Sequence, residues 1–235
     1  MSPKLLTVVC MTAGLAALSA AQDRPVKIVL VGDSTVNDEG GWGPGFRASF
    51  GSQVEVINLA KNGRSSKSFR DEGLWAPALA AKPNYILIQF GHNDVPGKGA
   101  DRETIAGTTY RENLARYIAE ARTAGAVPVL VTSIVRRNFT PERKIVADSL
   151  VPYVRAVRSL GSDEHVPVLD LYSLTLAQAE ALGPAGCEEI DARDKDGKRD
   201  HTHLGPKGRR DIGIMAARAF VQAFPDLQKY FVEPR

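Results

Sequence analysis

The segment Val26-Lys27-Ile28-Val29-Leu30-Val31-Gly32-Asp33-Ser34 is a nearly continuous apolar run that ends in Gly-Asp-Ser. A Val- and Ile-rich run that stops at Gly and Asp predicts a β-strand followed by a turn. Apolar residues at successive positions are typical of parallel strands that are covered on both faces. Functional residues of open α/β sheets lie at the carboxyl ends of strands, so Ser34 is a candidate nucleophile. An isolated Gly-Asp-Ser more often ends a strand or caps a helix, and the rest of the chain must decide.

Four further apolar runs follow at intervals that suit an alternating α/β chain. They span residues 54–59, 85–90, 127–132 and 166–171. Apolar residues at spacings of three and four predict helices over residues 102–124, 141–160 and 205–224. Pro152 is expected to bend the second helix, and residues 183–200 are expected to form an irregular surface loop. This alternation predicts an α/β fold with a doubly wound, mostly five-stranded parallel sheet.

Length and charge limit the classes of protein that the chain can be. It has 235 residues, of which 43% are hydrophobic, enough to bury the core of one domain without a covalent crosslink. Its formal net charge of +3 is small, and no basic run is interleaved with aromatic residues as in many nucleic-acid-binding proteins. We therefore expect a single domain over residues 22–235, a monomer, and no nucleic-acid partner.

The first 21 residues have the features of a secretory signal. Lys4 supplies a positive charge, residues 5–18 are apolar, and Ser19-Ala20-Ala21 offers small residues for cleavage. The apolar stretch is short for a membrane span, although an uncleaved anchor is the alternative. Cleavage after Ala21 predicts a secreted or periplasmic protein without a membrane partner. Cys187 would then be the only cysteine, so no internal disulfide could form.

Three loops follow the first three predicted strands and carry residues suited to acyl transfer. The first contains Ser34, the second contains Gly63 and the third contains Asn93. Because parallel strands end at the same edge of a sheet, these three residues are expected to converge. The backbone N–H groups of Ser34 and Gly63 and the amide of Asn93 are suitable donors for the oxyanion that forms when a serine attacks a carbonyl. A glycine also allows close approach of substrate to the backbone.

A nucleophilic serine needs a base and a carboxylate that orients it. Asp200 stands three residues before His203, just ahead of the last predicted helix. One short segment can therefore carry both groups, with His203 facing Ser34. His201 is expected to be structural or to line the rim of the site, and His165 is expected at the surface. The chemistry predicted for this set is serine acyl transfer, which requires no metal or cofactor.

These motifs together resemble the GDSL, or SGNH, hydrolase family. The matching blocks are Gly32-Asp33-Ser34, Gly63, Gly91-His92-Asn93-Asp94 and Asp200-His201-Thr202-His203. The resemblance implies that Ser34, Asp200 and His203 form the catalytic triad and that Ser34, Gly63 and Asn93 form the oxyanion hole. It also implies a flavodoxin-like three-layer α/β/α sandwich.

A narrower resemblance is to rhamnogalacturonan acetylesterases. It depends on four segments: 32–36, Gly41-Trp42-Gly43, 62–69 and 201–204. It implies deacetylation of a pectic polysaccharide outside the cytoplasm. Trp42 is then either a platform for a sugar ring or a residue of the core. Arg64 and His201 are candidate substrate contacts. Arg64 also belongs to a basic group with Lys61, Lys67 and Arg70 that either attracts galacturonate carboxylates or is a solvated face.

Two alternatives stay open at this point, and a third, a calcium loop, is set aside. The same family includes esterases of other specificity, such as acetylxylan esterases, lysophospholipases and thioesterases. A carbohydrate-binding protein on an inactive hydrolase scaffold is the alternative outside enzymes. Residues 191–200 resemble a calcium loop in their Asp and Gly content, but Ala192 and His203 stand where that motif needs acidic residues.

Overall fold

The computed structural model describes residues 25–234, so the segment predicted to be a signal peptide lies outside the described residues. Five parallel strands form the central sheet, in the order β2-β1-β3-β4-β5. Their bounds are β1 (Val26–Gly32), β2 (Val54–Asn58), β3 (Tyr85–Gln89), β4 (Val127–Val131) and β5 (Val168–Leu169). The predicted α/β class and five-stranded parallel sheet are confirmed, and the order is that of flavodoxin-like folds.

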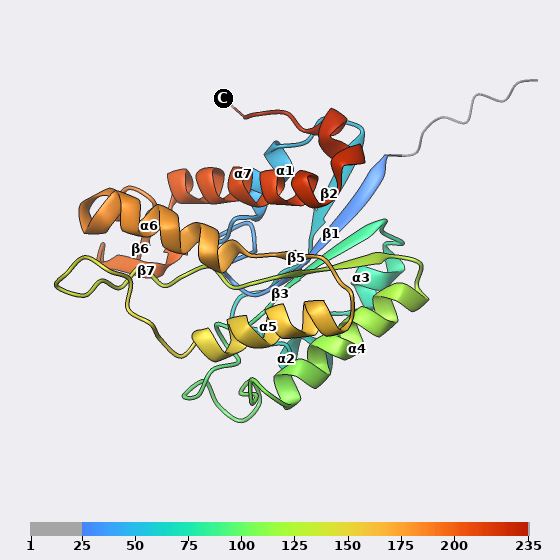
Figure 1. Cartoon of the computed structure of the whole chain (residues 1–235), viewed down its shortest axis with the longest axis horizontal. Helices are drawn as coiled ribbons and strands as arrows, with labels where there is room; N and C mark the ends of the chain where they lie inside the picture. The colour runs from blue at the N-terminus through green and yellow to red at the C-terminus, as the bar shows by residue number, and fades with distance from the viewer. Residues whose placement is uncertain (1–24, 235) are drawn as a thin grey trace, which may run out of the picture.

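Helices cover both faces of this sheet and make three layers (Figure 1). One layer contains α2 (Ser68–Asp71), α3 (Ala76–Ala80), α4 (Thr109–Thr123) and α5 (Val151–Asp163). The opposite layer contains α1 (Gly43–Ala48), α6 (Leu171–Glu188) and α7 (Pro206–Ala223), and the 3₁₀-helix η1 (Pro225–Tyr230) follows α7. The predicted three-layer sandwich is therefore confirmed.

Alternation along the strands divides the core into two apolar clusters. In β1, Val29 and Val31 belong to the cluster that includes α4, whereas Ile28 and Leu30 belong to the cluster that includes α7. All four side chains are fully buried. A strand places successive side chains on opposite faces, so an uninterrupted apolar run supplies both layers. This is why the sequence of β1 does not alternate with polar residues.

In the layer of α1, α6 and α7, a helix from early in the chain packs directly against a helix from near its end. A Cβ atom placed on Gly213 of α7 would lie only 2.4 Å from the Cα of Gly45 in α1. The two helices therefore touch backbone to backbone, which any larger residue would prevent. The segment that follows Ser34 is fixed in this way against the helix that follows His203.

Two predicted helices begin later than expected. Helix α4 begins at Thr109 rather than residue 102, because Thr104 is bonded to Asp94 through its N–H (2.9 Å) and its hydroxyl (3.0 Å). Helix α5 begins at Val151 rather than residue 141. Pro152 lies in its first turn, where a missing N–H costs no hydrogen bond, so the expected bend is wrong.

The prediction of an irregular loop over residues 183–200 is also wrong. Helix α6 continues to Glu188 through a kink at Gly183, which has a φ of 66°. The antiparallel strands β6 (Asp191–Arg193) and β7 (Arg199–Leu204) then form a hairpin. Asp200 and His203 therefore lie on a strand. The short strand β6 and its charged turn have no periodic apolar pattern that would reveal a hairpin.

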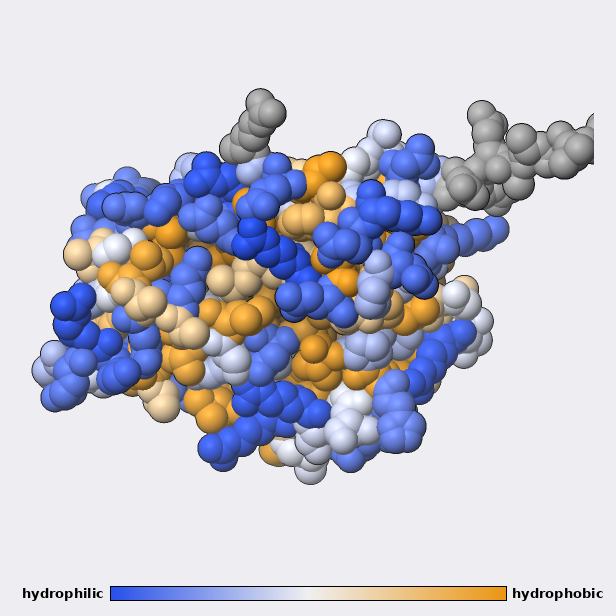
Figure 2. Space-filling view, turned by 45° about the horizontal axis from the view of Figure 1, so that its top comes forward, coloured by the Kyte–Doolittle hydropathy of each residue, from blue (hydrophilic) through white to orange (hydrophobic). Residues whose placement is uncertain are grey.

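The surface on the side of α6 and α7 is mixed in polarity. Figure 2 shows hydrophilic residues interspersed with small apolar patches on this side. Leu174 of α6 is among the exposed apolar side chains, at 40% exposure. Within residues 25–234, no helix combines the length and the apolar character needed to cross a bilayer.

Candidate active site

Ser34, His203 and Asp200 form one line of hydrogen bonds. His203 Nε2 lies 2.8 Å from Ser34 Oγ, and His203 Nδ1 lies 2.7 Å from Asp200 Oδ2. Ser34 follows β1 and the other two residues lie on β7, so the tertiary fold brings together residues 169 positions apart. A nucleophile in contact with a base, itself oriented by a carboxylate, is the geometry that serine acyl transfer requires.

Asp200 is held as an ionised acceptor. Its Oδ1 accepts hydrogen bonds from the backbone N–H groups of Thr202 (2.8 Å) and His203 (3.0 Å). Partial burial alone would raise the pKa of Asp200, but the hydrogen bonds from the His203 ring and from these N–H groups outweigh it and lower the pKa. The carboxylate can therefore hold an Nδ1–H proton of His203 and leave Nε2 free to accept one from Ser34.

Gly63 and Asn93 lie on two loops that are bonded to each other. Gly63 has a φ of 74°, in the left-handed region that favours glycine. Asn93 Nδ2 donates to the carbonyl of Arg64 at 3.1 Å, which orients the amide and leaves its second N–H for another acceptor. The carboxyl ends of β1 and β3 are the switch point of this strand order, which is where α/β folds bind ligands.

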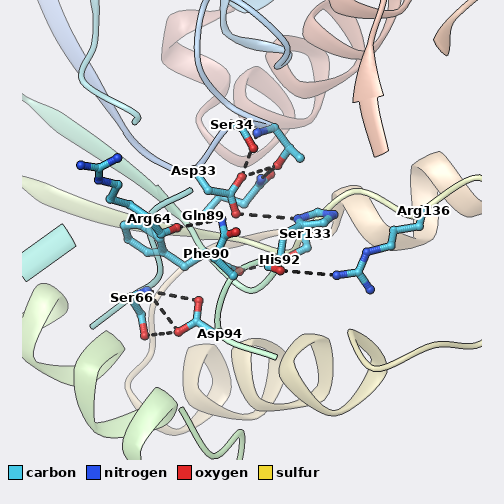
Figure 3. Close-up of polar contacts among 12 residues, drawn as sticks. Asp33, Ser34, Arg64, Ser66, Gln89, Phe90, His92, Asp94, Ser133 and Arg136 are labelled. Atoms are coloured by element: carbon cyan, nitrogen blue, oxygen red, sulfur yellow. Dashed lines mark hydrogen bonds and ion pairs between the residues drawn. The ribbon is translucent and has the colours of Figure 1, made fainter. Parts of the chain in front are cut away.

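The Asp94 side chain also links these two loops through hydrogen bonds. Both of its carboxylate oxygens lie 3.1 Å from the backbone N of Ser66, and Oδ1 accepts the Ser66 hydroxyl at 2.5 Å. Figure 3 shows this carboxylate pointing toward Ser66. Burial raises the pKa of Asp94 to about 7, against the lowering effect of these hydrogen bonds. The fourth residue of Gly91-His92-Asn93-Asp94 therefore has a structural role next to the site.

Asp33 and His92, which directly precede Ser34 and Asn93 in the sequence, contact each other in the core. Asp33 Oδ2 lies 3.7 Å from His92 Nδ1, and the other carboxylate oxygen accepts from the N–H (2.8 Å) and hydroxyl (2.7 Å) of Thr35. Burial raises the pKa of Asp33 and, together with the positive charge of Arg136, lowers the pKa of His92 well below its usual value. Figure 3 shows the contact, which links the loops that follow β1 and β3. No sequence pattern predicted it.

The prediction that Trp42 is a platform for a sugar ring is wrong, because its side chain is fully buried. Its indole N–H donates to Gln89 Oε1 at 2.9 Å, and Gln89 Nε2 donates to the Thr35 hydroxyl at 2.7 Å. That hydroxyl donates in turn to Asp33. The alternative interpretation, a core residue, is the one that the structure supports, and Trp42 acts through this buried chain on the loop that carries Ser34.

The two other candidate substrate contacts have different surroundings. Arg64 Nη2 pairs with Glu72 at 2.7 Å, and Arg64 Nη1 donates to the carbonyl of Asn62 at 2.8 Å. His201 lies beside His203 on β7, and its Nδ1 is 3.7 Å from Asp191 Oδ2. Both side chains are about 40% exposed. The role of Arg64 and His201 as substrate contacts remains a prediction.

A buried ion cluster that the sequence did not predict supports β7. Arg137 pairs with Asp191, and the two side chains are each only 1% exposed. Arg137 Nη2 donates to the carbonyl of His203 at 2.8 Å, and its backbone N–H donates to the carbonyl of His201 at 2.8 Å. Arg199 also pairs with Asp191. Asp191 is thus held by two arginines, and residues 25–234 contain no group of three or more His, Cys, Asp or Glu side chains arranged to bind a metal ion.

Several known proteins are similar to this chain in sequence or in structure. Residues 30–210 match the family model of the GDSL-like Lipase/Acylhydrolase family. The chain is 34% identical over 227 residues to the rhamnogalacturonan acetylesterase RhgT of Bacillus subtilis, covering 89% of this chain and 95% of that protein. Among solved structures, the acetylxylan esterase Axe2 of Geobacillus stearothermophilus has a TM-score of 0.60 at 18% identity, covering 83% of this chain and 92% of that one. A Bacillus subtilis protein has a TM-score of 0.73 at 22% identity, covering 85% of this chain and 57% of that one.

Proposed function

The chain belongs to the GDSL-like lipase/acylhydrolase family, and on that premise we propose that it is a secreted serine esterase that removes O-acetyl groups from plant cell-wall polysaccharide. The substrate we infer is rhamnogalacturonan, because a relative with 34% identity over most of both chains is a rhamnogalacturonan acetylesterase. Secretion is inferred from the signal-like residues 1–21. The observation that carries the enzymatic proposal is the hydrogen-bonded line from Ser34 through His203 to Asp200.

The proposed reaction begins with attack of Ser34 Oγ on the acetyl carbonyl while His203 Nε2 takes the hydroxyl proton. Asp200 stabilises the imidazolium that forms. The carbonyl oxygen becomes an oxyanion that accepts from the backbone N–H groups of Ser34 and Gly63 and from the Asn93 amide. Losing one such donor typically costs a factor of about 10² to 10³ in rate.

Collapse of this intermediate releases the sugar hydroxyl. His203 gives its proton to the leaving oxygen, which leaves an acetyl ester on Ser34. Water then attacks the acetyl-serine while His203 takes a proton from it. His203 returns this proton to Ser34 Oγ as the bond between Oγ and the acyl carbon breaks, which releases acetate and restores the enzyme. Each step uses protein groups and water alone, and the proposed scheme requires no cofactor.

Replacement of the nucleophile tests the proposal directly. We expect Ser34→Ala to lower kcat on an aryl acetate by up to about 10⁶, by analogy with other serine triads. Ser159→Ala, on α5, is the matched control and should keep full activity. A serine-reactive phosphonate should label the wild type and not Ser34→Ala. Ordinary turnover by Ser34→Ala would overturn the assignment, and failure of the wild type to be labelled would favour a non-catalytic scaffold.

The polysaccharide is tested separately by acetate release. We expect faster release from acetylated rhamnogalacturonan than from acetylated xylan at equal acetyl content. Faster release from xylan would reject the pectin assignment and leave the esterase assignment intact.

A further inference from the structure

Most of the basic side chains predicted around the oxyanion loop are already paired. Three ion pairs account for them: Arg64 with Glu72 at 2.7 Å, Lys67 with Asp71 at 2.6 Å and Arg70 with Glu120 at 2.6 Å. Each partner lies within the domain. These groups therefore have carboxylates that compete with any acidic ligand.

Arg102 reaches the same place from a different loop and is not paired in this way. Among residues 25–234, the one carboxylate that it approaches is that of Asp101, 3.9 Å from Nε, and Asp101 is itself 79% exposed. Arg102 Nε is buried without a hydrogen-bond partner. Nη1 lies 3.9 Å from the point where a Cβ atom on Gly63 would stand. A guanidinium group thus lies beside the glycine that we assign to the oxyanion hole.

The loop that carries Arg102 is fixed on the active-site framework. The Arg102 N–H donates to the carbonyl of Gly99 at 2.9 Å, and the Thr104 N–H donates to the carbonyl of Asp94 at 2.9 Å. The Tyr153 hydroxyl contacts the carbonyls of both Asp94 (2.9 Å) and Thr104 (2.6 Å). Asp94 also holds Ser66, so the backbone at Arg102 keeps a defined position relative to the loops of Gly63 and Asn93.

We propose that Arg102 is a carboxylate subsite, which binds the carboxylate of an acidic sugar that neighbours the acetylated residue in the polysaccharide. This deepens the proposed function and rests on it. A guanidinium presents a planar set of donors that matches a carboxylate in two parallel hydrogen bonds. The Arg102 side chain is 35% exposed, which leaves it accessible while the protein shields part of its charge. A neutral polysaccharide offers hydroxyl and ether oxygens as acceptors but no negative charge to pair with this arginine.

The test measures binding, which does not depend on turnover. Calorimetric titration uses a deacetylated oligosaccharide that contains galacturonate, and the same oligosaccharide with its carboxyl groups reduced to alcohols. We expect Arg102→Gln to raise the Kd for the acidic oligosaccharide about tenfold or more, since a hydrogen bond to a charged group has this effect. Arg102→Lys should recover part of the loss. Neither variant should change the Kd for the reduced oligosaccharide.

Lys98→Gln is the matched control, because it removes one positive charge from the same loop. It should change the Kd less than twofold. Equal losses in Lys98→Gln and Arg102→Gln would replace the subsite by a general electrostatic effect and overturn the proposal. So would an unchanged Kd in Arg102→Gln, or wild-type binding that does not distinguish the two oligosaccharides. If the wild type binds the acidic oligosaccharide through Arg102 but releases no acetate, the proposed function fails and the subsite stands.

Discussion

Gly40 shows how one residue limits the position of the catalytic histidine. A Cβ atom on Gly40 would lie 3.2 Å from His203 Cδ2, which is tighter than ordinary van der Waals contact. The carbonyl of Gly40 also accepts the N–H of Leu204 at 2.9 Å. The residue therefore fixes β7 through its backbone and leaves just enough room for the ring.

We predict that Gly40→Ala lowers kcat on an aryl acetate about tenfold, because the added methyl group would shift the His203 ring by a few tenths of an ångström from Ser34. KM and Tm should change little. Gly51→Ala is the control, since a Cβ atom on Gly51 would have no neighbour within 4 Å. Unchanged kcat in Gly40→Ala would show that the ring position tolerates this displacement.

The hairpin of β6 and β7 is the element that carries Asp200 and His203, and it lies outside the central sheet. Arg137 ties it to the domain through the carbonyls of His201 and His203 and through Asp191. Two ion pairs converge on Asp191 in the core. Buried pairs of this kind are costly to break because removing one partner leaves an uncompensated charge.

We predict that Arg137→Met lowers the free energy of unfolding by about 3 to 5 kcal/mol, measured by urea denaturation. In the folded variant, kcat on an aryl acetate should fall at least about tenfold with KM nearly unchanged, because His203 loses its backbone support. Arg158→Met removes an exposed pair with Asp170 and should cost at most about 1 kcal/mol. Normal kcat in folded Arg137→Met would limit its role to stability.

At the scale of the whole molecule, Asp94 connects loops that follow different strands. It binds Ser66 after β2 and Thr104 before α4, and its backbone carbonyl accepts from Tyr153 of α5. Its pKa of about 7 stands above the ordinary value of 3.8. Between these pH values the folded protein therefore holds a proton that the unfolded chain has lost.

We predict that Asp94 makes the free energy of unfolding fall as pH rises from about 4 to about 7, by at most about 1.4 kcal/mol per pH unit. Asp94→Asn cannot lose a proton, so its stability should fall less over this range. The difference between the two urea-denaturation series isolates this group from other titrating residues. Parallel pH dependences in the two proteins would contradict the prediction.

Local sequence patterns were enough to predict the order of the strands along the chain, the fold class and the contact of Ser34 with the Asp200–His203 pair. Apolar runs such as residues 26–31 and 85–90 are local patterns, and the carboxyl ends of parallel strands must share one edge. The position of Ser34, Gly63 and Asn93 at that edge followed from this rule. The pairing of His203 with Asp200 followed from their spacing, and the structure places them in hydrogen-bond contact with Ser34.

The burial of individual polar and aromatic residues, and the partners they contact, follow from the tertiary fold and not from the sequence pattern. The sequence around Trp42 fits a sugar platform as well as a core residue, and the contact of its side chain with Gln89 distinguishes the two. Arg137 and Asp191 are 54 positions apart, and Arg102 approaches Gly63 from a loop that was predicted to be helical. Such contacts depend on how distant segments fold together and not on any local period. The electrostatic surroundings that follow from them, and with them the expected choice of substrate, are therefore properties of the folded chain.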